Sequence, residues 1–204
     1  MTSFADSFLT ETACLIERLD RDDIERLAST LGRVRDRGGR LFVLGVGGSA
    51  SYAQHAASDF RKLCRFEAYT PTDNVAELTA RINDDGWDSS FVNWLQGSRL
   101  TKDDAILVLS VGGGSRDQNV SVNLVNAIEL AQHVGAHILG IVGRDGGFTR
   151  ASAEASVVIP PIFPEHVTAQ TEGLCAVIWH LLVSHPSLSQ EAAKWESMSV
   201  RSSS

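Results

Sequence analysis

The stretch RLFVLGVGGSASYAQHAASDF, residues 40–60, decides the fold of this chain. Its first part, RLFVLGV (40–46), is a short and nearly continuous apolar run, which is typical of a strand buried on both faces of a parallel sheet. A glycine turn at residues 47–49 follows, and the chain then runs helically through residues 51–66. The stretch therefore predicts one unit of strand, tight turn and helix.

The same order of elements returns further along the chain. AILVLSV (105–111) predicts a second strand, GGGSRDQ forms a turn, and NVSVNLVNAIELAQHVG (119–135) has the apolar spacing of a helix. AHILGIVG (136–143) and ASVVIPPI (155–162) predict two more strands. Strands that alternate with helices indicate an α/β fold with a parallel sheet and right-handed crossovers.

Helices account for most of the remaining sequence. Apolar residues at steps of three and four predict two amphipathic helices within residues 1–39. Residues 74–95 predict two helical pieces broken at 84–86, and a last helix is expected from Pro164 to about Ser184, with Pro186 just beyond its end. We expect one domain over residues 1–204, with the α/β core at 40–186 and a polar tail at 187–204.

Composition and charge exclude several classes of protein. A chain of 204 residues with 43% hydrophobic residues can bury one sizeable core. The net charge of -7 argues against a nucleic acid or an anionic membrane as partner, since either needs clustered Lys and Arg. No run approaches about 18 apolar residues, and no basic region precedes the first apolar positions. We therefore expect a soluble, cytoplasmic protein that holds any phosphate ligand locally.

The three cysteines, Cys14, Cys64 and Cys175, are odd in number, widely separated and without CxxC spacing. They are expected to be reduced, packed thiols, and neither Cys64 nor Cys175 has an evident adjacent base that would make it a nucleophile.

Two glycine turns stand at the carboxyl ends of predicted strands. The first contains Gly47, Gly48 and Ser49 and opens a helix, where free backbone amides and the helix dipole favour an anion. The second runs from Ser110 to Ser115 and adds hydroxyl groups. Each could be merely a tight connection, but two such turns at one edge indicate a phosphate site more strongly than one.

Four ionisable residues are candidates for chemistry. His55 and Asp59 are four residues apart and share one face of their helix, as a metal site, an acid-base pair or an ordinary surface pair would. Glu172 and His180 lie on the otherwise apolar last helix, where a buried imidazole could equally be a satisfied core residue. Eight helical residues separate their Cα atoms by about 12 Å, so the two could share an ion only with long reach, a bent helix or residues from different subunits.

Several segments in order make the chain resemble the phosphoheptose isomerases of the sugar isomerase (SIS) fold. They are GVGGSASYAQHAASDF, ELTARINDDGWDSSFVNWL, VLSVGGGSRDQNV, ILGIVGRDGG and TAQTEGLCAVIWHLL. The resemblance covers nearly the whole chain to about Ser184. It implies a flavodoxin-like SIS fold with a parallel sheet flanked by helices and an N-terminal helical hairpin, assembled as a homotetramer with active sites between subunits.

The resemblance also implies roles for particular residues. Ser49, Ser110 and Ser115 match the family's phosphate-binding serines, and Asp84, in a segment that alone reads as a turn, matches the aspartate that shapes the sugar site. The metal-binding and catalytic set of the family matches His55, Asp59, Glu172 and His180, with one zinc ion expected per site. This chain departs from the family at four positions: it has Asp59 where the family usually has Glu, Glu172 where it has Gln, Val46 where it has Asn, and Gly112 where it has a serine. Its second turn is also two residues longer before Asn119 than the turn of the family.

The reaction implied is the conversion of sedoheptulose 7-phosphate to D-glycero-D-manno-heptose 7-phosphate through an enediol, in heptose biosynthesis. Asp59 is the base by resemblance, Glu172 is the substitute if the shorter Asp59 does not reach, and His180 is the acid-base partner. Zinc would act as a Lewis acid. The alternatives are an isomerase for another sugar phosphate, which the altered second turn suggests, and a non-catalytic SIS protein similar to the DnaA initiator-associating proteins, which usually lack a full ionisable set.

Overall fold

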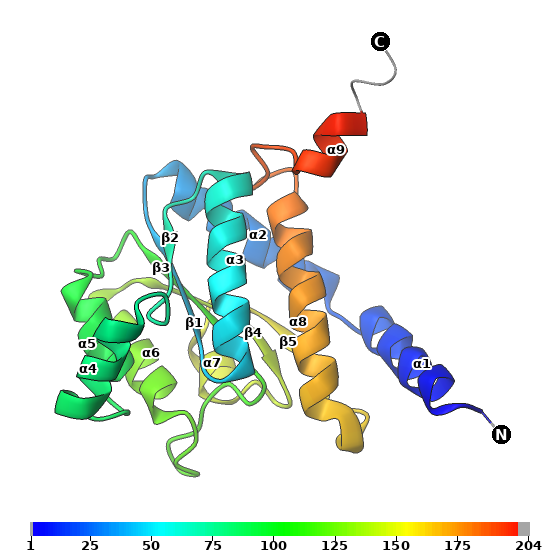
Figure 1. Cartoon of the computed structure of the whole chain (residues 1–204), viewed down its shortest axis with the longest axis horizontal. Helices are drawn as coiled ribbons and strands as arrows, with labels where there is room; N and C mark the ends of the chain where they lie inside the picture. The colour runs from blue at the N-terminus through cyan, green and yellow to red at the C-terminus, as the bar shows by residue number, and fades with distance from the viewer. Residues whose placement is uncertain (1, 200–204) are drawn as a thin grey trace.

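Five parallel strands form the centre of the molecule in a computed structural model that describes residues 2–199. The strands are β1 (Leu41–Gly45), β2 (Ala68–Tyr69), β3 (Ala105–Ser110), β4 (His137–Gly143) and β5 (Ala155–Ile159). Their order across the sheet is β2-β1-β3-β4-β5 (Figure 1). The four longer strands confirm the sequence prediction, while the two-residue β2 was not predicted because so short a strand has no periodicity to detect.

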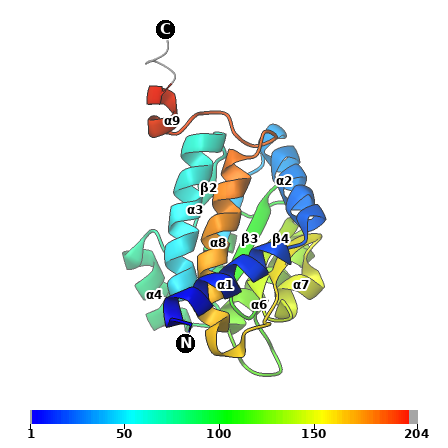
Figure 2. The same cartoon turned by 90° about the vertical axis from the view of Figure 1, so that its right-hand side faces the viewer.

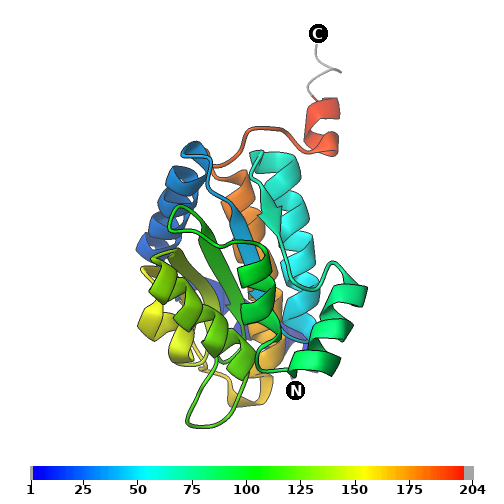
Figure 3. The same cartoon turned by 90° about the vertical axis from the view of Figure 1, so that its left-hand side faces the viewer.

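Helices cover both faces of this sheet, as Figure 3 shows from one side. One layer contains α2 (Arg21–Asp36), α3 (Gly48–Cys64) and α8 (Val167–Ser184). The other contains α5 (Ser90–Gly97), α6 (Val122–Val134) and α7 (Gly147–Ser152), and α4 (Val75–Asp85) packs outside α5. Alternate residues of β1 point to opposite faces of the sheet. Leu41 and Val43 pack in the hydrophobic core beneath the first helix layer, while Phe42 and Leu44 pack in the core beneath the second. This is the predicted α/β architecture.

The N-terminal helix α1 (Phe4–Glu17) lies across α8 (Figure 2). Glu11 pairs with His166, in the short 3-10 helix η1 (Pro164–His166) before α8, at 2.7 Å. Thr12 donates a hydrogen bond to Gln170 in α8 at 2.9 Å. The second predicted N-terminal helix is α2, so both expected helices are present, and α1 is anchored on the last helix of the core.

Beyond Pro186 the chain forms one further short helix, α9 (Lys194–Ser199), within the segment predicted to be a polar tail. Residues 200–204 of that segment lie outside the described residues. Among residues 2–199, no helix combines the length and the apolar character that a membrane crossing needs.

The sheet order places both glycine turns side by side. The chain passes from β1 to β2 on one side, and from β3 to β4 and β5 on the other, so β1 and β3 flank the point where the winding direction changes. Gly45 at the end of β1 pairs with Leu109 near the end of β3. Ligands of doubly wound sheets bind at this point, outside the carboxyl ends of the strands. A side chain at Gly45 would come within 2.2 Å of the Ser49 carbonyl, so glycine is required where the strand turns directly into α3.

Candidate active site

The first glycine turn leaves the amino end of α3 open. Gly47 precedes α3 with a φ of 62° and a ψ of -126°, a conformation that favours glycine, and no side chain caps the helix. The first amides of a helix have no partner inside it, and the helix dipole favours an anion there. Ser49 is 7% exposed, and its hydroxyl makes no hydrogen bond to any of the described residues. The turn therefore keeps backbone and hydroxyl donors free for a ligand.

The second glycine turn is held in shape from within and from outside. Ser110 Oγ accepts a hydrogen bond from the Gly113 amide at 3.0 Å, and Ser115 Oγ accepts one from the Gln118 amide at 3.2 Å. Thr149 Oγ1 donates to the Gly113 carbonyl at 2.7 Å. Each serine hydroxyl can still donate its own hydrogen to a ligand, because the bonds just named use only its oxygen as acceptor.

Three of the four predicted metal ligands come together between α3 and α8. His55 Nε2 lies 3.4 Å from Asp59 Oδ2, and His180 Nε2 lies 3.5 Å from the same oxygen. All three ligand atoms lie within 4.8 Å of one another. Trp179, beside His180 on α8, donates its indole N–H to Asp59 Oδ2 at 3.2 Å. The Asp59 side chain is 16% exposed, while about half of each histidine side chain is exposed. The two imidazoles are therefore open to solvent, and the carboxylate between them is largely buried.

The hydrogen bonding of His180 shows that this group suits a cation. Its Nδ1 lies 2.7 Å from the Ala176 carbonyl, which can only accept, so Nδ1 carries the hydrogen. In a neutral ring, Nε2 then directs a lone pair toward the Asp59 carboxylate. Two acceptors at that distance are unfavourable unless a proton or a metal ion lies between them. A ligating histidine whose other nitrogen donates to a carbonyl, together with a carboxylate held by a further donor, is the usual arrangement of a zinc site.

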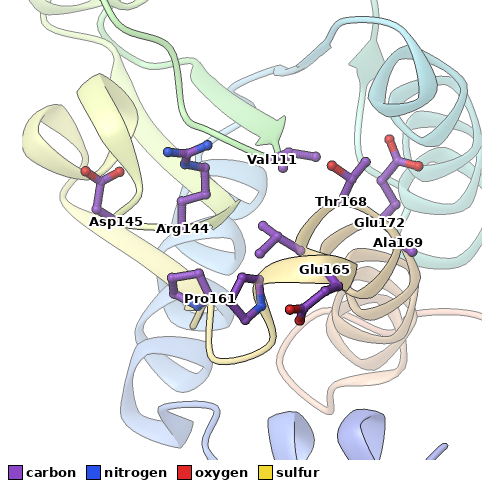
Figure 4. Close-up of a pocket in the computed structure, with 10 residues that line it drawn as sticks. Val111, Arg144, Asp145, Pro161, Glu165, Thr168, Ala169 and Glu172 are labelled. Atoms are coloured by element: carbon purple, nitrogen blue, oxygen red, sulfur yellow. The ribbon is translucent and has the colours of Figure 1, made fainter. Parts of the chain in front are cut away.

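Glu172, the fourth predicted ligand, lies outside this group. Its carboxylate rests against the first glycine turn, where a side chain on Gly48 would come within 2.6 Å of Glu172 Oε1. Glu172 also lines a cleft of about 830 Å³, opposite Arg144 and next to Thr168 (Figure 4). Its side chain makes no hydrogen bond or ion pair with the rest of residues 2–199, so a carboxylate is free at the cleft wall.

Asp84 is not brought to these residues within one chain. It lies on α4, exposed, and its Oδ1 accepts a hydrogen bond from the neighbouring Asn83 at 2.8 Å. The role implied for it by resemblance therefore stays a prediction.

The cysteines are packed thiols. Cys64 and Cys175 are buried and Cys14 is half-buried, all without a disulfide. Burial raises the pKa of the Cys175 thiol to about 12, with a smaller contribution from the nearby Glu172 carboxylate, and burial likewise raises the pKa of Cys64 to about 11. Neither supplies a thiolate at neutral pH.

Sequence reasoning missed two residues of this region. Trp179 is a buried core residue, and it also fixes Asp59 through its N–H. Its position next to His180 was the only signal, and a single sequence does not show which helix it faces. Arg144 lies in the segment ILGIVGRDGG but was given no role, although it lines the cleft.

Comparison with known proteins finds relatives among the phosphoheptose isomerases. No family model matches the chain. A phosphoheptose isomerase of Chlorobaculum tepidum is 32% identical over 157 residues, which cover 71% of this chain and 69% of that protein. The lincomycin biosynthesis protein LmbN of Streptomyces lincolnensis is 30% identical over 190 residues, covering 88% of this chain and 67% of that protein. The solved structure of a phosphoheptose isomerase from Francisella tularensis has a TM-score of 0.75 at 22% identity, covering 90% and 97% of the two chains, which confirms the fold.

Proposed function

The chain belongs to the phosphoheptose isomerase family, and from that premise we propose that it isomerises sedoheptulose 7-phosphate to D-glycero-D-manno-heptose 7-phosphate in the cytoplasm, as a step of heptose biosynthesis. The observation that carries the proposal is that three chemical groups lie on the turns that precede α3 and α6 and on the packed helices α3 and α8. Two glycine turns at the carboxyl edge of the sheet offer donors for a phosphate, a His-Asp-His group between α3 and α8 suits a metal ion, and a free carboxylate on α8 lines a cleft.

Glu172 is the base in this proposal. Asp59 Oδ2 already faces Trp179 and two imidazoles, whereas the Glu172 carboxylate is unpaired and faces the cleft. Glu172 takes a proton from C1 of the ketose, the C1–H electron pair forms a C1=C2 bond, and the electron pair of the C2 carbonyl moves onto O2 to give the enediolate. The same proton then returns to C2, while the O1 proton moves to O2 and leaves C1 as the aldehyde.

His55, Asp59 and His180 would hold a zinc ion, which when bound would supply Lewis-acid polarisation of the substrate carbonyl. Asp59 faces both imidazoles, the Ala176 carbonyl orients the His180 ring, and Trp179 fixes Asp59. The alternatives from the sequence are Asp59 as the base and His180 as its acid-base partner. Zinc content separates the two roles of His180, since a pure acid-base residue can be replaced without loss of the metal.

We propose that the chain acts as a homotetramer in which a second subunit covers the metal group. Val177 and Leu181, which are exposed and apolar, flank His180 on α8. Phe4 and Leu9 on the crossing helix α1 are also exposed. Apolar side chains around a half-exposed polar site are typical of a surface that another chain covers. Such a partner could also supply Asp84 to the site.

A second candidate is the isomerisation of another sugar phosphate. The similarity to LmbN, a protein of lincomycin biosynthesis, and the extended second turn favour this candidate. The groups that act on C1 and C2 would be the same, and the rest of the sugar would differ.

Incubation of the zinc-loaded protein with sedoheptulose 7-phosphate, followed by NMR of C1 and C2, tests the proposal. The expected result is an aldoheptose 7-phosphate, with the rate lost on chelation. If only another ketose phosphate is converted, the second candidate is correct. If no member of a phosphosugar panel changes, the isomerase proposal is wrong and a binding role takes its place.

A further inference from the structure

Arg144 has an unusual backbone conformation at the edge of the sheet where the site lies. It directly follows β4 and has a φ of 56°, a left-handed conformation that costs free energy for any residue with a side chain. The next residues close a turn, since the Gly146 amide donates to the Gly143 carbonyl at 2.9 Å. Strained positions of this kind are concentrated at binding sites. The groups that the Arg144 side chain lies against therefore indicate what it could bind.

The Arg144 side chain lies over the second glycine turn. A β-carbon on Gly112 would stand 3.9 Å from Arg144 Cδ, so the arginine occupies the space beside a residue that has no side chain. Arg144 also lines two clefts. One is the cleft of about 830 Å³ that contains Glu172, and the other, of about 560 Å³, is lined by Gly112, Gly114 and Ser115 of the turn. Figure 4 shows Arg144 facing the first cleft from the wall opposite Glu172.

The guanidinium is unpaired within the part of the chain that the structure describes. Asp145, Glu165 and Glu172 line the same cleft, yet none of them forms an ion pair with Arg144. Glu129 lines the second cleft and pairs with Arg116 instead, at 2.8 Å. In a chain of net charge -7, a cation between two clefts without a carboxylate partner is available to an anionic ligand.

We propose that Arg144 binds the phosphate group of the substrate and supplies the donor that Gly112 lacks. The planar guanidinium can donate two parallel hydrogen bonds to a phosphate, while Ser110, Ser115 and the first turn hold its other oxygens. This inference rests on the proposed function, because it assigns a binding residue to the same site.

The test compares Arg144→Ala with Arg99→Ala. Arg99 is a matched control, because it is also exposed and left-handed (φ 53°), but it precedes β3 at the opposite edge of the sheet. Arg144→Ala is expected to raise the KM for sedoheptulose 7-phosphate on the order of ten- to hundredfold, with a smaller effect on kcat. Arg144→Lys should recover part of the lost affinity, since lysine restores the positive charge but cannot donate two parallel hydrogen bonds as the guanidinium does. Arg99→Ala should match the wild type.

Two further measurements separate binding from structure and from catalysis. Arg144→Gly relieves the backbone strain, so its Tm should equal or exceed that of the wild type while its KM stays high. Inorganic phosphate, titrated into each variant and followed by 31P NMR, reports the anion site even if the sugar tested is the wrong one. Weaker phosphate binding in Arg144→Ala alone supports the proposal, whatever the isomerase assay shows. Equal phosphate binding in all variants, or none by the wild type, overturns it.

Discussion

Asp59 Oδ2 lies 3.5 Å from His180 Nε2, so a carboxylate on α3 faces an imidazole on α8 across the packed pair of helices. The same oxygen lies 3.4 Å from His55 Nε2 and accepts the indole hydrogen bond of Trp179. One carboxylate thus organises the whole group, and Asp59 is the centre of the proposed metal site.

Replacing Asp59 with Asn should therefore abolish tight zinc binding. The amide keeps the size of the side chain but removes the charge that attracts the ion. The zinc content after dialysis, measured by atomic absorption, should fall close to zero. Asp36→Asn, an exposed aspartate on α2, is the control and should keep its zinc. A fully loaded Asp59→Asn protein would show that the ion binds elsewhere.

Trp179→Phe tests the support of that carboxylate. The substitution keeps most of the buried ring but removes the N–H that fixes Asp59, so zinc affinity should drop by roughly tenfold or more. Competition with a chromophoric chelator measures the affinity. Trp94→Phe removes an indole from the other face of the sheet and should leave zinc affinity unchanged. Equal affinities in both variants would mean that the indole bond is incidental.

Gly48→Ala probes the position of Glu172 without altering its charge. The new methyl group would come within 2.6 Å of Glu172 Oε1 and should displace the carboxylate from the cleft wall. A misplaced base can slow the reaction on the order of a hundredfold, so kcat should fall while the zinc content stays the same. Gly32→Ala, in helix α2 with its nearest contact at 3.4 Å, is the matched control. Unchanged turnover of Gly48→Ala would argue that Glu172 is not the base.

Asp104 is predicted to carry an acid-sensitive part of the stability. Burial alone would raise its pKa, but hydrogen bonds from Arg40 and Thr101 lower it below the ordinary carboxyl value. Such a group stabilises the fold above its unfolded pKa of about 3.9 and loses this contribution as pH falls through the lower folded value.

Asp104→Asn should therefore cost about 3 kcal/mol at pH 7, because it leaves Arg40, which bonds the carboxylate at 2.8 Å, without its charged partner. Urea unfolding at pH 7 and again below pH 4 measures the effect. The difference between variant and wild type should shrink in acid. A difference that is the same at both pH values would contradict the assignment.

Much of the fold follows from local patterns in the sequence. The four longer strands are continuous apolar runs, and the glycines after β1 and β3 mark their ends, so the carboxyl edge could be predicted as the ligand site. β2 and α7 have two and six residues, too few for periodicity to show. The crossing of α1 over α8 depends on tertiary contacts such as Glu11 with His166, which no local pattern encodes.

The site could be predicted only in part for a similar reason. His55 and Asp59 are four residues apart, so helical geometry alone places them together. His180 joins them because α8 packs against α3, a long-range contact that the family resemblance implied but spacing could not. Glu172 is two helical turns from His180 and faces the cleft, which agrees with the separation of about 12 Å expected for a straight helix.

The role of Glu172 as the base is tested by the turnover of sedoheptulose 7-phosphate by the zinc-loaded wild type and by Glu172→Gln, with zinc content measured on the same samples. The wild type should form the aldoheptose phosphate. Glu172→Gln should keep its zinc and lose roughly 10²- to 10⁴-fold in kcat, the usual contribution of a general base. If Glu172→Gln has the wild-type rate, Glu172 is not the base and Asp59 is the remaining candidate. A folded, zinc-loaded wild type that leaves sedoheptulose 7-phosphate unchanged would contradict the proposed substrate.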